Sequence, residues 1–133
     1  MRYRPLIIGA LLWIVGTVAI RLGGQGLLHP NRPAATLILY LASFVLMALL
    51  VPRTFRRLGL AGDSWPAAAT LLMLPTLLLD PFSCACFTVI FPNVEPAAAG
   101  VFGGWMLIFC AGAVVGVWLK AGVTPAVEAG EKR

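Results

Sequence analysis

The sequence predicts an all-α protein, an antiparallel four-helix transmembrane bundle. The first observation is composition, because 60% of the 133 residues are hydrophobic and only 11% are charged. Soluble domains carry about 25% charged residues, and a small globule has too little interior to bury so much apolar surface. The second observation is that the apolar residues fall into four runs, which Gly- and Pro-rich turns separate. We therefore expect one membrane domain over residues 1–120 and a flexible cytoplasmic tail over 121–133.

The first apolar run follows two arginines and extends from Pro5 to Ile20. A basic start before an apolar stretch is also typical of secretory signal peptides, which end in a small-x-small cleavage site. No such site follows here, because Arg21 and the letters LGGQG come next. We therefore predict a retained first span over residues 5–27.

The second span is predicted over residues 34–52, where no charged residue occurs. Its length is close to the roughly 20 apolar residues that cross a bilayer core as a helix. The turn letters HPNRP precede it at 29–33. Pro33 stands just before the run, where the missing backbone N–H of a proline is harmless.

The third span is predicted over residues 66–91, after the longest polar connection, VPRTFRRLGLAGDSWP at 51–66. Asp80 and Pro81 interrupt this run. Because proline removes a helical hydrogen bond and clashes with the preceding turn, we expect a break near Pro81.

The fourth span is predicted over residues 97–119, which are 23 residues without a charge. The turn FPNVEP at 91–96 precedes it, and its last residue, Pro96, again stands at a helix start. This run alone is long enough to cross a bilayer core as a helix.

Orientation follows from Lys and Arg, which accumulate on the cytoplasmic side of membrane proteins. With the N-terminus inside, eight basic residues lie inside and two outside. The inner set is Arg2, Arg4, Arg53, Arg56, Arg57, Lys120, Lys132 and Arg133, and the outer set is Arg21 and Arg32. We therefore predict an N-in, C-in, multi-pass protein of the inner (plasma) membrane. These topology signals explain the net charge of +5, so the expected partner is the lipid bilayer and not a nucleic acid.

The fourth span carries four glycines that recur at multiples of four residues, namely Gly100, Gly104, Gly112 and Gly116. Residues four apart lie on nearly the same helix face, so these glycines predict a smooth groove with two GxxxG patterns. Such grooves let a second helix approach closely within lipid. The groove serves either internal packing of the bundle or docking, as a homo-oligomer or in a larger membrane complex.

Few residues offer catalytic or ligand chemistry. Cys84 and Cys86 form a C-x-C pair, a weak metal candidate because it supplies only two ligands, and Cys110 and the lone His29 add no further pair. We expect no metal, no cofactor and no enzymatic activity. The four tryptophans, Trp13, Trp65, Trp105 and Trp118, are interpreted as interfacial anchors or packing residues.

Two charges fall inside predicted spans. Arg21 lies 16 residues beyond Pro5 and Asp80 lies 14 residues beyond Pro66, which gives depths of about 24 and 21 Å at a helical rise of 1.5 Å per residue. An isolated charge in the membrane is costly, so the matched depths favour a buried Arg21–Asp80 pair, joined by Gln25. The alternative is that Arg21 snorkels to the headgroups and Asp80 caps a helix near water.

The letters RLGGQ after the first span, an Asp late in the third, and FPNVEPAAAGVFGGW at the start of the fourth carry a resemblance. From Leu11 to Leu119 the chain resembles a family of small bacterial four-span membrane proteins of unknown function. The resemblance implies four retained helices and no particular activity. It draws attention to a set of residues that excludes the cysteines. The set is Arg21, Gln25, Asp80, Pro92, Asn93 and Trp105.

Two classes of function fit these features. The first is a non-enzymatic accessory or structural subunit of a membrane assembly, which docks through the glycine face. The alternative is a small transporter or permease component that uses the Arg21–Asp80 pair to hold an anionic or proton-coupled substrate.

Overall fold

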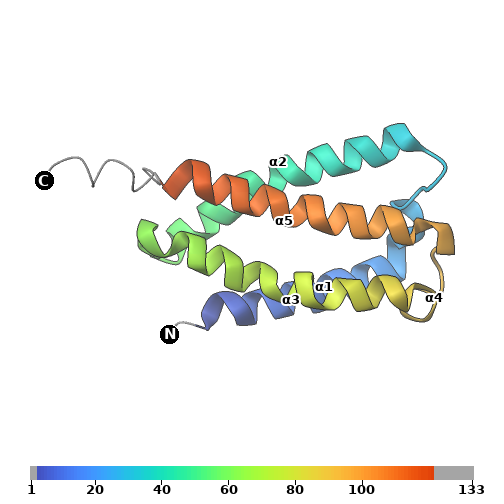
Figure 1. The fold of residues 1–133 in the computed structure, drawn as a ribbon, viewed down its shortest axis with the longest axis horizontal. Coiled ribbons are helices and arrows are strands. Elements are labelled where there is room, and N and C mark those ends of the chain that lie inside the picture. The colour runs from blue at the N-terminus through green and yellow to red at the C-terminus, as the bar shows by residue number, and fades with distance from the viewer. Residues whose placement is uncertain (1–2, 122–133) are drawn as a thin grey trace, which may run out of the picture.

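The computed structural model describes residues 3–121, and within this range the chain is helical, with no strand. Four long helices lie side by side (Figure 1), and all four are long and apolar enough to cross a membrane. The long helices are α1 (Arg4–Gly23), α2 (Pro33–Arg57), α3 (Trp65–Ala85) and α5 (Ala99–Ala121). The short elements are η1 (Gly24–Gly26), η2 (Gly62–Ser64), α4 (Phe87–Ile90) and η3 (Pro96–Ala98). The predicted all-α four-helix bundle is thus confirmed. The tail predicted beyond 121 lies outside the described residues.

Proline stands in the first helical positions of α1, α2, α3 and η3, where its backbone nitrogen has no bond to lose. α2 continues past the predicted end of its span, through Pro52 to Arg57. Arg56 and Arg57 occupy its last turn, where positive charge interacts favourably with the helix dipole. This explains why part of the polar connection is helical. The orientation relative to the membrane stays a prediction.

The predicted third span is broken at Cys86 and not at Pro81. α3 runs through both Pro75 and Pro81 and ends only at Ala85, and Cys86 then separates it from α4. Prolines are tolerated inside membrane helices because side chains and neighbouring helices re-satisfy the freed backbone groups. The carbonyl that Pro81 leaves without a helical donor is that of Leu77, four residues earlier, whereas the Ser83 hydroxyl donates to the carbonyl of Leu79 at 3.2 Å.

The helices do not pack in sequence order. α1 packs on α3, α3 packs on α5, and α5 packs on α2, whereas α1 and α2 make few or no direct contacts. Figure 1 shows α5 lying between α2 and α3, with α1 alongside α3. Because α1 and α2 are joined by a short connection but not packed together, the bundle is left open between them.

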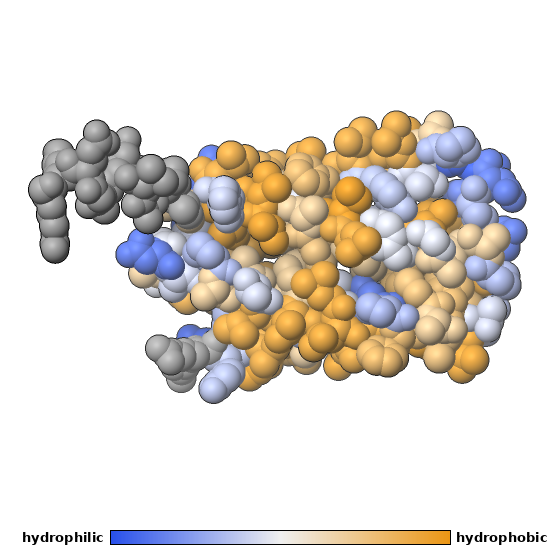
Figure 2. Space-filling view, viewed as in Figure 1, coloured by the Kyte–Doolittle hydropathy of each residue, from blue (hydrophilic) through white to orange (hydrophobic). Residues whose placement is uncertain are grey.

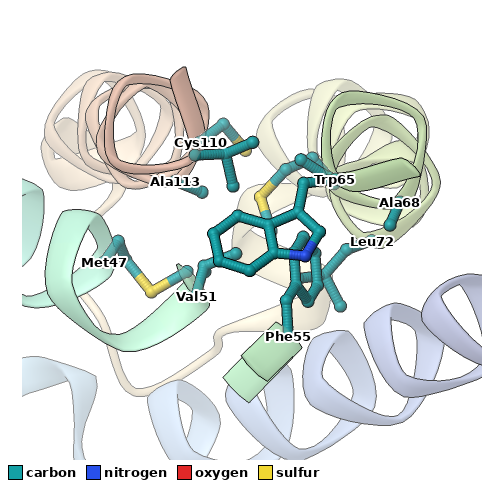
Figure 3. Close-up of a cluster of buried hydrophobic side chains, with 11 residues drawn as sticks. Met47, Val51, Phe55, Trp65, Ala68, Leu72, Cys110 and Ala113 are labelled. Carbon is teal, nitrogen blue, oxygen red and sulfur yellow. The ribbon is translucent and has the colours of Figure 1, made fainter. Parts of the chain in front are cut away.

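Two buried clusters hold the bundle at its ends. At the end that contains the α2–α3 connection, Trp65 lies among side chains of α2, α3 and α5 (Figure 3), and its ring meets Phe55 edge-on at 6.2 Å. At the opposite end, which holds η1, α4 and η3, Phe87, Phe91 and Phe102 pack with ring centroids 5.1–5.8 Å apart. These clusters fix both ends and leave the middle of the α1 side less well packed.

The surface matches a membrane position. On the face drawn in Figure 2, most residues in the middle of the bundle are apolar, and most hydrophilic residues lie towards its two ends. Many large apolar side chains of α1, α2 and α5 are exposed. Lipid covers such faces as well as another protein would, so their exposure needs no protein partner.

Candidate binding site within the bundle

A cavity of about 360 Å³ occupies the opening between α1 and α2. Its floor is formed by α3 and α5, which lie behind the opening. Most of its wall is apolar, with aromatic and aliphatic side chains from all four long helices. Representative lining residues are Leu12, Leu50, Leu72, Phe102, Met106 and Phe109.

Asp80 is the one charged side chain that lines this cavity. It is only 6% exposed. Its Oδ1 accepts a hydrogen bond from Nε1 of Trp13 at 2.8 Å. Its Oδ2 has no hydrogen-bond partner, and it is the one such buried side-chain oxygen or nitrogen among residues 3–121. A membrane-buried acid with an unused oxygen is the main polar feature of the cavity.

A close contact between two helices positions Trp13. Gly9 lies four residues before Trp13, so both residues share one face of α1. A Cβ atom at Gly9 would collide with the backbone carbonyl of Leu72 in α3. The glycine therefore lets α1 approach α3 closely, and this approach brings the Trp13 indole within reach of Asp80.

A second, smaller cavity of about 210 Å³ lies on the other side of Asp80, between α3 and α5. Thr76, Asp80 and Met106 line both cavities. Asp80 therefore contributes to the lining of two cavities, as does Thr76 of the same helix.

The Arg21–Asp80 pair predicted from matched depths is not formed. Nη1 of Arg21 instead donates a hydrogen bond to the carbonyl of Ile90 at 2.9 Å. Ile90 is the last residue of α4, and the last carbonyls of a helix lack partners within it. Because the third span breaks at Cys86, α4 ends at Ile90 and its last carbonyl can accept a hydrogen bond from Arg21. The sequence analysis, which expected the break near Pro81, did not predict this acceptor.

Gln25 also takes no part in a polar cluster with Asp80. Its Nε2 donates a hydrogen bond of 3.4 Å to the carbonyl of Leu22, three residues earlier in the chain. The structure therefore replaces the predicted group of three residues with a different pair, Asp80 and Trp13. The signal in the sequence was the position of Trp13 in the middle of the first span, where an indole N–H has no water to bind.

Three of the four predicted glycines form a packing face between α5 and α2. A Cβ at Gly112 would collide with the backbone of Phe44, and one at Gly116 with the backbone of Ala48. Gly104 lies against the Tyr40 ring, whereas Gly100 has open space around it. The GxxxG pattern of Gly112 and Gly116 is therefore used inside the chain.

The family of unknown function DUF5367 matches residues 27–124 of the chain. The chain belongs to this family. The match confirms the resemblance to a family of unknown function, but it begins at residue 27 and not near Leu11. It covers α2, α3, α4 and α5, with Asp80 and the glycine face, whereas α1 and Trp13 lie before it. No curated protein and no solved structure matches the sequence.

The three cysteines of this DUF5367 protein form no disulfide in the structure. Cys84, Cys86 and Cys110 are free, and Cys86 is exposed whereas Cys110 is buried. Over residues 3–121, no three His, Cys, Asp or Glu side chains gather as metal ligands would. Cys84 lines the smaller cavity, and its Sγ lies 3.9 Å from the carbonyl of Ala99.

The remaining tryptophans and His29 have structural contacts in this DUF5367 protein. Trp105 donates to the hydroxyl of Ser43 at 2.7 Å and so ties α5 to α2. Trp65 donates to the carbonyl of Leu60 at 2.9 Å, and Trp118 is exposed on the apolar surface. The backbone carbonyl of His29 faces the Thr36 hydroxyl at 3.5 Å.

Proposed function

We propose that this protein is a non-enzymatic membrane protein that holds a small lipophilic ligand between α1 and α2, as a component of a transporter or permease. The observation that carries the proposal is a buried acid, Asp80, which lines an apolar cavity and has one oxygen without a hydrogen-bond partner. Ionisable residues inside membrane spans are expensive and mark substrate or ion pathways by default. An acid with a purely structural role would be expected to have both oxygens satisfied.

The shape of the cavity supports a small ligand and not a partner helix. Its volume of about 360 Å³ lies at the lower end of the range of about 300–1,000 Å³ that holds small molecules. The polar side chains in the cavity lining are one carboxylate, two indoles and three hydroxyls, namely Asp80, Trp13, Trp105, Thr17, Thr54 and Thr76. This set suits binding, and it contains no nucleophile paired with a base, as covalent catalysis would need.

The accessory-subunit role has less support. It relied on the glycine face of the fourth span, and Gly112 and Gly116 of that face already pack on α2. A partner would have to displace α2 or use a face that lipid covers equally well. We therefore assign the function to the cavity and not to the glycine face.

The plasma membrane and the N-in, C-in orientation belong to the same proposal. They rest on the eight-to-two distribution of basic residues over the predicted sides. A reporter that is active only outside the cytoplasm, fused after Arg133, should be silent in a bacterial host. Strong activity of this fusion would reverse the orientation.

A matched pair of glycine variants tests the ligand-holding role. Gly16 lines the cavity and Gly100 does not, yet a Cβ has open space at both positions. Gly16→Leu should fill the cavity, and Gly100→Leu should change only a side chain outside it. Both variants should fold in phosphatidylcholine nanodiscs.

The measurement is photolabelling with octanol that carries a diazirine at its far end, with mass spectrometry to find the labelled residues. Labelling of cavity residues should saturate and be competed by plain octanol, whereas labelling from bulk lipid rises linearly with concentration. We expect saturable labelling in the wild type and in Gly100→Leu, and its loss in Gly16→Leu. Equal labelling of all three proteins, or no saturable labelling in the wild type, would refute the proposal.

A further inference from the structure

The cavity between α1 and α2 contains an acidic side chain without a basic partner. Asp80 is the one charged side chain in the lining of both cavities, and neither lining contains a Lys or Arg. Arg21 is engaged with the carbonyl of Ile90 and not with the carboxylate. In the described part of the chain, no cation therefore neutralises this acid.

The carboxylate is also held in one orientation. Trp13 binds Oδ1 at 2.8 Å and comes from a helix whose approach Gly9 permits. Oδ2 is buried without a partner while the residue lines the cavity. An oriented acceptor is a better ligand for an incoming donor than a mobile one, because less rotational freedom is lost on binding.

We infer that the ligand is a small amphipathic amine, an apolar body with one positively charged amino group that donates a hydrogen bond to the carboxylate of Asp80. This inference rests on the proposed function and specifies its ligand. Hydrogen bonds between ionised partners are about twice as strong as neutral ones. The low dielectric of the site strengthens this interaction, as it strengthens any electrostatic contact.

The same geometry disfavours the other classes of amphiphile. An anionic group would meet the unneutralised acid, and like charges placed together are strongly unfavourable. A neutral alcohol can donate one hydrogen bond to the carboxyl group, but it brings no positive charge to pair with the acid. The preference should therefore run from amine to alcohol to carboxylate, with apolar bodies of equal size.

Three probes with the same photoactivatable octyl body and different head groups test this order: octylamine, octanol and octanoate. The full chain is reconstituted in phosphatidylcholine nanodiscs, because a lipid without net charge does not concentrate the amine at the surface. Saturable labelling of cavity residues such as Leu12 and Leu50 is followed as the probe concentration rises. We expect the amine to saturate at the lowest concentration and the octanoate to show no saturable labelling.

Two matched acid variants locate the source of the preference. Asp80→Asn keeps the shape of the side chain and removes its charge, and should abolish the preference for amine over alcohol. Glu95→Gln removes an acid that is exposed outside both cavities, and should leave the preference as in the wild type. Size-exclusion chromatography checks that each variant keeps the wild-type assembly.

The outcomes separate the two proposals. If the alcohol and the amine saturate at the same concentration in the wild type, the inference about the amine is wrong and the ligand-holding cavity stands. If no probe gives saturable labelling of the cavity, the proposed function itself fails. The comparison of head groups on the wild-type protein needs no variant. It therefore tests the preference for an amine even if Asp80→Asn does not fold.

Discussion

The interface of α2 with α5 and the space between α1 and α2 are built in opposite ways. At the first, two glycines bring the backbones together, and two cross-helix hydrogen bonds, from Tyr40 to the carbonyl of Val101 and from Trp105 to Ser43, satisfy the polar groups. At the second, the helices stay apart, an apolar cavity remains, and Oδ2 of Asp80 is left without a partner.

The difference shows that one part of this small membrane bundle stabilises the fold and another part is suited to binding. Within lipid, helices associate through close packing and interhelical hydrogen bonds, since there is no hydrophobic drive between them. The α2–α5 interface uses both and therefore forms the scaffold. On the α1 side the helices α1 and α2 are not packed together, so a cavity remains and Asp80 keeps an unsatisfied oxygen. A binding site needs both features, a cavity and a polar group that can contact the ligand.

The largest effect is expected where the scaffold is tightest. Gly112→Leu places a large side chain against the backbone of Phe44, and overpacking of this kind costs about 3 kcal/mol or more when the backbone has to move. We expect the free energy of unfolding in bicelles to fall by that amount, or the bundle not to assemble. Gly100→Leu, on the same helix but in open space, should remain close to wild type. Equal stability of the two variants would show that α2 and α5 do not rely on this contact.

The hydrogen bond between Trp13 and Asp80 should give the next largest effect. Trp13→Phe keeps an aromatic ring but removes the N–H donor, so Oδ1 loses its partner and neither carboxylate oxygen is then hydrogen-bonded. Hydrogen bonds to charged groups contribute about 1.5–3 kcal/mol, and we expect a coupling of about 2 kcal/mol in a double-mutant cycle of Trp13→Phe with Asp80→Leu. The measurement is unfolding in bicelles. Additive effects would show that α1 is not tied to α3 at this point.

How far the sequence predicts the structure also differs between the two regions. The glycine face and the helix starts at Pro33 and Pro66 could be predicted, because they depend on local spacing and backbone chemistry. The partner of Asp80 could not, because it depends on how α1 and α3 align along their axes. A depth estimate from each helix start omits both the contact of Gly9 with Leu72 and the helix break at Cys86.

A smaller effect of opposite sign is expected from Asp80→Leu alone. The variant removes an acid with an unsatisfied oxygen, and a charge inside the membrane costs about 2.5–3.5 kcal/mol at the midplane and less towards the surface. It also forfeits the bond from Trp13, so the net gain in the free energy of unfolding should be about 1 kcal/mol. The same protein should lose its preference for the amine probe. A strong loss of stability would instead show that Asp80 is needed for folding.

The smallest effect concerns Arg21 and Asp80, which the sequence suggested as a pair. If they were paired in the bundle, removing one would strand the other, at a cost of typically about 3–5 kcal/mol, and removing both would recover much of the loss. In the structure Arg21 binds the carbonyl of Ile90 and Asp80 binds Trp13. The changes Arg21→Ala and Asp80→Leu should therefore be additive within about 0.5 kcal/mol in a cycle of unfolding in bicelles. The cycle with Trp13 uses the same Asp80→Leu change, so the two coupling energies can be compared directly. If the coupling of Asp80 to Arg21 were larger than its coupling to Trp13, α1 and α3 would be aligned differently from their alignment in the structure.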